Sequence, residues 1–211
     1  MSSRFESLTG LVDEAFPEYD RPPAEPMDLL RRWVEEAKAE GVREPLALAL
    51  ATADARGRAS TRMVAVIDVT DRGALFTSHS SSRKGREIAE TGWGSGVLYW
   101  RESGRQIILS GPIVQVPDDE AERLWAARPP QLHPMSAASR QSEPLEDAAA
   151  LQAEADRLAA SDGPLPRPAR FAGYRLEPAA VEFWAAAATR LHRRLRYDKT
   201  PAGWQARRLQ P

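Results

Sequence analysis

Apolar residues near the start of the chain recur three or four positions apart, which is the spacing of one face of an α-helix. They are Met27, Leu30, Trp33, Val34 and Ala37. Pro26 suits a first helical turn, and Gly41 follows the last apolar residue as a stop signal. The pattern predicts an amphipathic helix that begins at Pro26 and ends before Gly41.

Beyond this helix the apolar residues come in short, partly alternating runs, separated by turns such as 54–57. Such runs predict β-strands joined by tight turns. The predicted strands are 46–53, 58–69, 74–77, 96–100, 106–116, 173–176, 180–184, 191–197 and 204–209. The predicted helices between them are 83–90, 118–127 and 143–160. This order predicts an α+β chain, mainly antiparallel β, with a closed sheet and peripheral helices.

Composition limits the domain organisation and the partners. The chain has 211 residues, of which 42% are hydrophobic, which is enough for one domain with a proper core. We expect residues 1–25, which are polar and interrupted by prolines, to be an N-terminal segment that is mobile or lies over the body of the protein. Residues 26–211 are expected to form a single domain. Proline clusters at 129–134 and 164–168 are expected to be linkers.

The net charge of −1 argues against nucleic acid or an anionic membrane as a partner. The N-terminus has no apolar signal-peptide core, and no apolar run reaches transmembrane length, so we expect a cytoplasmic protein. The chain has no cysteine, and its three histidines are far apart without a ligand motif, so no metal site is predicted.

Serine and basic residues gather where the helix 83–90 is predicted to begin. Ser80, Ser81 and Ser82 directly precede Arg83 and Lys84. Hydroxyl groups, a helix N-terminus and two cations are what a phosphate group requires. The alternative is a solvated basic first turn.

Two further features indicate an anion. Arg62 lies inside an apolar strand and needs a partner, for which a ligand phosphate and a cross-strand carboxylate fit equally well. Arg190, His192 and Arg194 alternate along the predicted strand 191–197, so they would share one face and repel one another unless an anion lies there. A surface strand paired with acidic residues is the alternative.

Short motifs occur in a fixed order along the chain. They are Arg62-Met63-Val64, Ser82-Arg83-Lys84, Arg105-Gln106, Gln141-Ser142, Glu182-Phe183-Trp184 and Arg190-Leu191-His192-Arg193-Arg194. Together they resemble the pyridoxamine-phosphate-oxidase-like FMN enzymes, from about residue 25 to the C-terminus. The resemblance implies a six-stranded FMN-binding split β-barrel and a homodimer with FMN in two clefts at the subunit interface. The segments 3–9, 16–20, 91–93 and 190–197 resemble the members that act in phenazine biosynthesis.

The resemblance implies cofactor contacts along most of the chain. Arg62, Ser78, Arg83 and Lys84 would contact the phosphate region, while amides such as Gln106 suit the edge of the isoalloxazine ring because they donate and accept at once. The full set implied for FMN is Arg62, Met63, Val64, Ser78, Ser82, Arg83, Lys84, Gln106, Gln141, Ser142, Trp184 and Arg194, some of them from the second subunit. No catalytic residue is certain, and His192 is the one candidate acid or base.

One pocket departs from the vitamin B6 oxidases of this family. Those enzymes hold a substrate phosphate with a lysine, a tyrosine, an arginine and a serine, but here Ile67, Leu124 and Leu132 replace all but the arginine, Arg128. A phosphate would be poorly compensated there. The pocket therefore suits a larger, more apolar substrate that carries carboxylates. The residues implied for the substrate are Ile67, Leu124, Arg128, Leu132, Arg190 and His192.

The main hypothesis is an FMN-dependent oxidase, late in phenazine biosynthesis, that dehydrogenates partially reduced phenazine carboxylates. The substrate would be of the hexahydro- or tetrahydrophenazine-1,6-dicarboxylate type, with O2 as the electron acceptor. One alternative is a pyridoxine/pyridoxamine 5'-phosphate oxidase that makes pyridoxal 5'-phosphate. Another is a non-catalytic flavin- or haem-binding split barrel. A nicotinamide cofactor is unsupported, because the sequence has no glycine-rich nucleotide fingerprint.

Overall fold

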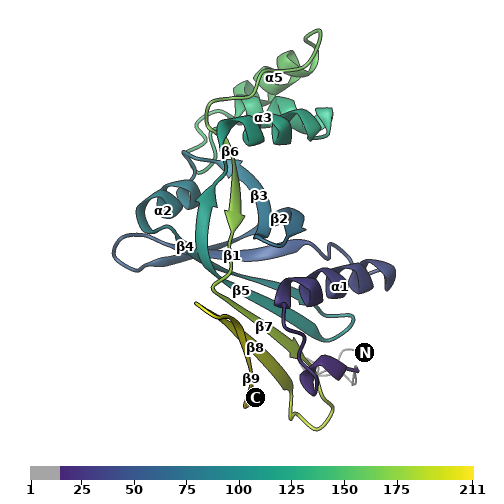
Figure 1. The fold of residues 1–211 in the computed structure, drawn as a ribbon. Coiled ribbons are helices and arrows are strands. Elements are labelled where there is room, and N and C mark those ends of the chain that lie inside the picture. The colour runs from purple at the N-terminus through teal and green to yellow at the C-terminus, as the bar shows by residue number, and fades with distance from the viewer. Residues whose placement is uncertain (1–14) are drawn as a thin grey trace.

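The computed structural model describes residues 15–211, in which helices flank a nine-stranded antiparallel sheet (Figure 1). The strands are β1 (Ala47–Ala53), β2 (Ala59–Thr70), β3 (Gly73–His79), β4 (Trp93–Trp100), β5 (Arg105–Gln115), β6 (Phe171–Leu176), β7 (Ala180–Ala185), β8 (Arg193–Thr200) and β9 (Gly203–Leu209). The helices are η1 (Pro17–Tyr19), α1 (Pro26–Ala39), α2 (Arg83–Thr91), α3 (Asp118–Ala127), η2 (Pro130–Leu132), α4 (His133–Ala138) and α5 (Ala148–Ala159).

Six strands close into a barrel in the order β1-β2-β3-β6-β5-β4, because β4 pairs with both β1 and β5. The long strand β5 first pairs with β7 along 105–110 and then with β6 along 113–115. Gly111 lies between the two pairings, where a Cβ would come within 2.2 Å of the Glu177 carbonyl oxygen. Only glycine permits this close approach. The predicted six-stranded split barrel is confirmed.

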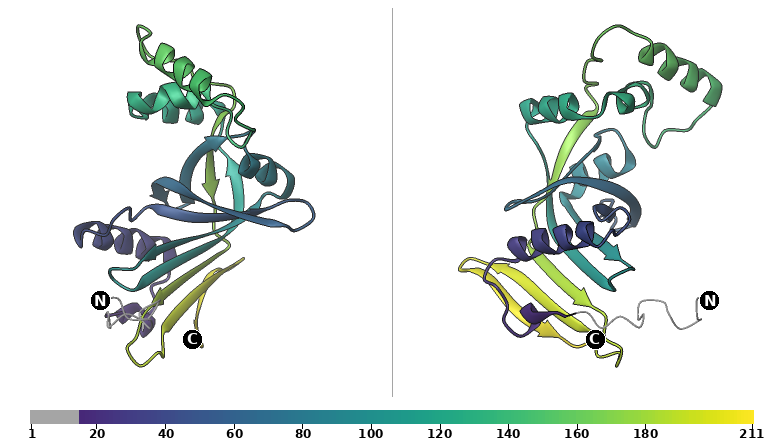
Figure 2. Two further views of the ribbon diagram at one scale, coloured as in Figure 1. Left: turned by 180° about the vertical axis from the view of Figure 1, so that it is seen from behind. Right: turned by 90° about the vertical axis from the view of Figure 1, so that its right-hand side faces the viewer.

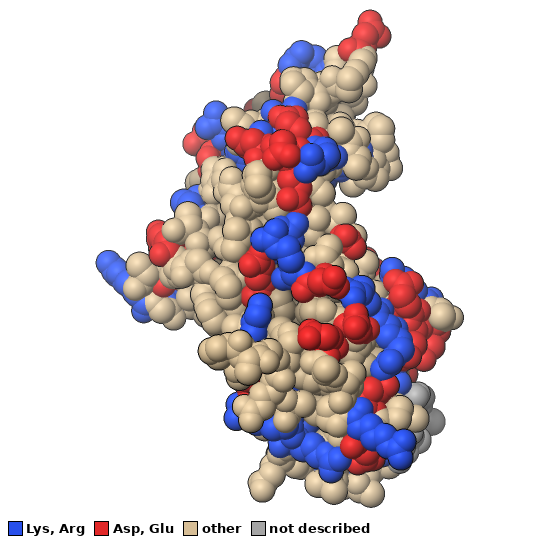
Figure 3. All heavy atoms as spheres, viewed as in Figure 1, with Lys and Arg blue, Asp and Glu red and all other residues tan. Residues whose placement is uncertain are grey.

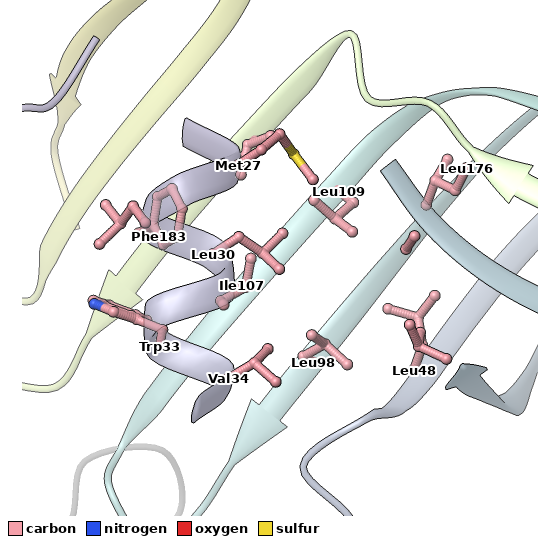
Figure 4. Close-up of a cluster of buried hydrophobic side chains, with 14 of the residues drawn as sticks. Met27, Leu30, Trp33, Val34, Leu48, Leu98, Ile107, Leu109, Leu176 and Phe183 are labelled. Atoms are coloured by element: carbon pink, nitrogen blue, oxygen red, sulfur yellow. The ribbon is translucent and has the colours of Figure 1, made fainter. Parts of the chain in front are cut away.

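Helix α1 confirms the helix predicted from Pro26, and its apolar face packs against strands β5 and β7 (Figure 4). Leu30 and Trp33 are fully buried, and the indole of Trp33 meets the ring of Phe183 at 5.2 Å in an edge-on arrangement. Each fully buried side chain of this size contributes roughly 1.5–3 kcal/mol to stability. The helix therefore fixes the N-terminal part of the chain to the barrel core.

The remaining elements gather at two ends of the barrel. Helices α3, α4 and α5 lie together at the end marked by β3 and β6, while β7, β8 and β9 extend at the other end (Figures 1 and 2). On the face shown in Figure 3, acidic and basic side chains are interleaved, in keeping with the net charge of −1.

Residues 15–25 lie against the body of the protein. Phe16 is buried and its ring lies 4.9 Å from that of Trp33. The Tyr197 hydroxyl donates to the Pro23 carbonyl at 3.1 Å, and Arg208 donates to the carbonyl of Tyr19 at 2.8 Å. The mobile segment predicted for 1–25 stays a prediction for residues 1–14, which lie outside the described part, as does the motif segment 3–9.

Three predicted elements are corrected. The helix predicted at 143–160 begins only at Ala148, because Asp147 caps it by accepting from the amide of Ala150 at 2.9 Å. The proline cluster at 129–134 is not a plain linker, since it carries η2 and the start of α4. The strand predicted at 191–197 begins at Arg193.

Candidate functional site

The basic start of α2 is built by a helix cap and a close backbone approach. The Ser82 hydroxyl accepts from the amide of Gly85 at 3.2 Å, as an N-cap does, and donates to the carbonyl of His79 at 2.7 Å. A Cβ on Gly85 would come within 2.4 Å of the Ser80 carbonyl oxygen. A glycine is thus required for the helix to begin this close to β3, which brings Arg83 and Lys84 beside that strand.

The side chain of Lys84 points towards a polar cluster, to which β3, α2 and the loop before α5 contribute. Its ammonium donates to the hydroxyl of Ser78 at 3.0 Å and to the Gln141 carbonyl oxygen at 3.4 Å. Ser78 also donates to Gln141 at 3.1 Å, and the Ser142 hydroxyl accepts from the backbone amide of Arg83 at 3.1 Å. Burial, and secondarily the charge of Arg62, lowers the pKa of Lys84. A partly buried ammonium bound to neutral oxygens is suited to an anion.

Arg62 has its partner, and it is a carboxylate that the sequence analysis missed. The guanidinium donates to Glu87 Oε2 at 3.3 Å, and Arg83 Nε donates to Glu87 Oε1 at 2.9 Å. The partner comes from helix α2, and not from a neighbouring strand as the alternative supposed. The sequence offered a signal only for the pair Arg83 and Glu87, which lie four residues apart on one helix, where side chains meet.

A cavity of about 620 Å³ extends from the basic side chains of Arg62 and Lys84 to Arg128, where the residues predicted for the substrate lie. Its lining includes cofactor candidates from β2, β3, α2 and the loop before α5, and substrate candidates from β2, α3 and η2. The cofactor candidates are Arg62, Met63, Val64, Ser78, Lys84, Gln141 and Ser142. The substrate candidates are Ile67, Leu124, Arg128 and Leu132. The side chains of Ser82 and Arg83 are not in this lining: Ser82 is buried as the cap, and Arg83 is exposed and held to Glu87.

Arg128 lies at the aliphatic end of the cavity without a carboxylate partner among residues 15–211. Its terminal nitrogens reach the hydroxyls of Thr77 at 3.4 Å and Ser136 at 3.3 Å, and its buried Nε has no partner. Burial lowers the pKa of Arg128. A desolvated guanidinium with such weak partners favours an anionic ligand group.

The other predicted site residues form a second group, which does not line this cavity in one chain. Strand register places Gln106, Trp184 and Arg194 side by side in one row across β5, β7 and β8. Arg194 Nε donates to the buried Glu182 carboxylate at 2.7 Å. The structure therefore places the predicted residues in two separate groups, which are candidate half-sites.

Arg190, His192 and Arg194 do not share one face of a strand, so that prediction was wrong. Arg190 has a φ of +65° and its amide donates to the Ala187 carbonyl at 2.9 Å, so it forms a turn before β8 begins. His192 lies in the same turn, 4.8 Å from the Trp184 ring, and its Nδ1 accepts from the Ala187 amide at 3.2 Å. Burial, then the charge of Arg190, lowers the pKa of His192. The turn, and not strand alternation, brings His192 to Trp184.

The sequence and fold of this chain match those of known proteins. The family model for pyridoxamine 5'-phosphate oxidase matches residues 34–162, and that for the pyridoxine 5'-phosphate oxidase C-terminal dimerisation region matches residues 171–211. The chain belongs to the pyridoxamine 5'-phosphate oxidase family. Enzymes of this family are flavin-dependent oxidoreductases.

Within the family, the chain is 56% identical to the dihydrophenazinedicarboxylate synthase of Burkholderia lata, over 100% of this chain and 99% of that protein. It is 40% identical to the pyridoxine/pyridoxamine 5'-phosphate oxidase of Paraburkholderia phymatum, over 88% of this chain and 89% of that one. The crystal structure of PhzG from Burkholderia lata in complex with tetrahydrophenazine-1-carboxylic acid superimposes with a TM-score of 0.94 at 54% identity, covering 96% of this chain and 100% of that one.

Neither a metal-ligand cluster nor a membrane-spanning helix is found in the described part of the chain. Residues 15–211 contain no group of three or more side chains that could hold a metal ion. The helices in this part are too short or too polar for any of them to cross a membrane.

His79 gives a testable pH dependence beside the cavity. The ring is 1% exposed, and burial, followed by the charges of Arg170, Lys84 and Arg128, lowers its pKa from 6.5 to about 4. As the pH falls, the histidine of the unfolded chain takes up a proton before that of the folded chain. The stability contributed by the neutral ring should therefore be complete above pH 6.5 and fall as the pH drops towards 4, by on the order of 3 kcal/mol. Denaturant unfolding of wild type and His79→Gln across this range should show a flatter profile in the variant; parallel profiles would refute the assignment.

Proposed function

We propose that this protein is an FMN-dependent oxidase of phenazine biosynthesis that dehydrogenates partially reduced phenazine carboxylates with O2. Bound FMN would supply the redox chemistry, in which the substrate loses a hydride and a proton and O2 is reduced to hydrogen peroxide. The chain's own residues bind and orient the two molecules and exclude water from them. The predicted cytoplasmic location belongs to this proposal and rests on the sequence.

The cationic end of the cavity supports the choice of FMN. Lys84, Arg62 and the hydroxyls of Ser78 and Ser142 supply positive charge and short-range donors, which fit the terminal phosphate that distinguishes FMN from riboflavin. The second half-site adds an amide, an indole and a guanidinium in one row, at Gln106, Trp184 and Arg194. An amide and a flat apolar ring suit the edge and face of a flavin.

The substrate assignment rests on the position of Arg128 among aliphatic side chains in the cavity. Ile67, Leu124 and Leu132 line the cavity around it and offer no hydrogen bonds to a second phosphate. A flat apolar heterocycle with a carboxylate fits both the aliphatic residues and Arg128. Its rings contact the aliphatic side chains, and its carboxylate pairs with the guanidinium. The ligand of the superimposable PhzG crystal structure, tetrahydrophenazine-1-carboxylic acid, has this chemistry.

Turnover of a reduced phenazine carboxylate tests the proposal. Anaerobic mixing of the FMN-loaded protein with tetrahydrophenazine-1-carboxylic acid should bleach the flavin absorption, and admitting air should restore it with O2 uptake and a changed product spectrum. Free FMN at the same concentration is the control for uncatalysed oxidation. Bleaching no faster than with free FMN would overturn the proposal.

A homodimer is part of the proposal, because one chain leaves an apolar sheet face uncovered. Register places Met63, Ala49, Val97 and Ile108 in one row across β2, β1, β4 and β5, and Met63 is 60% exposed. The two half-sites lie on strands at either side of this row. Covering the face with a second copy would remove apolar surface from water and allow each cleft to draw on both chains.

Sedimentation should give a dimer of the 23.3 kDa chain at ordinary working concentrations. Ala49→Arg should yield monomer and weaken FMN binding, because a charge would be buried unpaired in the interface. Ala55→Arg, in the exposed turn after β1, is the matched control and should remain dimeric. An FMN-loaded wild-type monomer would contradict the prediction.

A further inference from the structure

Glu87 is a buried carboxylate outside the sets of residues assigned to the cofactor and the substrate. It lies on α2, is 4% exposed, and points towards β1 and β2. Its Oε2 accepts from the hydroxyls of Thr52 at 2.5 Å and Ser60 at 2.6 Å. Burial alone would raise the pKa of Glu87, but hydrogen bonds from Ser60, Thr52, Arg83 and Arg62 outweigh it and lower the pKa to about 2. Glu87 is therefore a permanent negative charge beside the cavity.

Glu87 fixes the guanidinium of Arg62 at the edge of the cavity. One terminal nitrogen of Arg62 donates to the Thr52 hydroxyl at 2.6 Å and to the Leu50 carbonyl at 3.3 Å. The other donates to Ser60 and to Glu87, the latter at 3.3 Å. Four acceptors thus restrain both terminal nitrogens, so Arg62 offers a ligand its charge and its Nε donor, for which no partner is described.

The same carboxylate also restrains Arg83. Arg83 Nε donates to Glu87 Oε1, which leaves the two terminal nitrogens of Arg83 without a described partner at the exposed start of α2. One carboxylate therefore orients two arginines that come from different elements. A long cationic side chain held in this way loses less rotamer freedom when it binds a ligand.

The charges of this cluster match those of a phosphate monoester. Arg62, Arg83 and Lys84 carry three positive charges and Glu87 carries one negative charge, which leaves two positive charges. A phosphate monoester carries a charge of about −1.5 to −2 at neutral pH. Without Glu87 the three cations would repel one another in the absence of a ligand.

We propose that Glu87 is a positioning residue that holds Arg62 and Arg83 in place for the phosphate of the cofactor. The inference rests on the proposed function, in that FMN is taken as the ligand of the cationic end. It adds to that function a division of roles, in which Arg62 and Arg83 attract the phosphate and Glu87 holds these two arginines in place.

Removing the charge of Glu87 affects FMN affinity in two opposite ways, and the hydrogen bonds of Glu87 decide which effect is larger. Glu87→Gln takes away a negative charge that repels the phosphate. However, a glutamine offers one acceptor oxygen in place of two. It turns its donor NH2 towards Arg62 or Arg83, whose guanidinium groups only donate, so one of the two arginines is released. Because several hydrogen bonds are lost against one longer-range repulsion, FMN affinity should fall about tenfold or more.

Riboflavin separates positioning from a merely structural role, because it has the ring but no phosphate. Apoprotein should be titrated with FMN and with riboflavin, following flavin fluorescence, for wild type, Glu87→Gln and Glu87→Asp. We expect FMN affinity to fall in Glu87→Gln, an intermediate loss in Glu87→Asp, and unchanged riboflavin affinity in both. Inorganic phosphate should also compete with FMN less effectively in Glu87→Gln. Glu90→Gln, an exposed glutamate on the same helix, is the matched control.

The possible outcomes are distinguishable. Equal losses for FMN and riboflavin would assign Glu87 to the fold alone and overturn the proposal, as would tighter FMN binding in Glu87→Gln. Failure of the wild-type apoprotein to bind FMN would refute the proposed function itself. Should Glu87→Gln fail to fold, Ser60→Ala removes a partner shared by Glu87 and Arg62 and should give a smaller loss confined to FMN.

Discussion

Replacing Arg83 and Lys84 together by alanine should weaken FMN binding about a hundredfold or more. Lys84 presents a partly buried ammonium to the cavity, with hydroxyl and amide oxygens as its partners. Each lost charge-assisted hydrogen bond costs roughly 1.5–3 kcal/mol, and about 1.4 kcal/mol corresponds to a tenfold change in affinity. The measurement is a titration of apoprotein that follows flavin fluorescence.

The single variants sharpen this prediction. Lys84 lines the cavity and Arg83 does not, so Lys84→Ala should account for the larger share of the loss. Arg86→Ala is the matched control, because Arg86 is an exposed arginine on the same helix that bonds only to the Ser81 carbonyl among residues 15–211. Unchanged FMN affinity in the double variant would disprove the phosphate assignment.

Restoring the three missing phosphate ligands should reverse the substrate preference. The wild type should oxidise a reduced phenazine carboxylate about a hundredfold more efficiently than pyridoxine 5'-phosphate, since two or three hydrogen bonds to a phosphate are absent. The triple variant Ile67→Lys, Leu124→Tyr and Leu132→Ser places polar groups in the aliphatic wall around Arg128. It should gain activity on pyridoxine 5'-phosphate and lose it on the phenazine, as measured by steady-state O2 consumption with each substrate.

A matched control shows whether the effect belongs to the cavity. Leu145→Ser replaces an aliphatic side chain that is 62% exposed and lies outside this cavity, so it should leave both activities unchanged. If the wild type already turns over pyridoxine 5'-phosphate as efficiently as the phenazine substrate, the aliphatic wall does not set the substrate preference. The vitamin B6 oxidase alternative would then be the better assignment.

The order of helices and strands could be predicted because it depends on local patterns. The spacing of Met27, Leu30 and Trp33 allows burial of one helical face, and this requirement does not depend on which strands the helix meets. The start of α2 at Arg83, directly after its cap Ser82, could also be predicted from the sequence. The errors fell where a local rule was overridden, as at Arg190, where the extended pattern suggested a strand but the backbone turns with a positive φ.

What only the tertiary structure decided is which residues meet. Arg62 is tied to Glu87 because helix α2 packs across β1 and β2, and nothing in the spacing between positions 62 and 87 encodes that contact. Likewise, Gln106, Trp184 and Arg194 share a row because β7 pairs with β5 and β8 in one particular register. Periodicity determines which face a side chain takes on its own element, whereas long-range pairing determines its neighbours. For this reason the sequence by itself could propose candidate site residues, and only the packed barrel showed that these candidates fall into two separate groups.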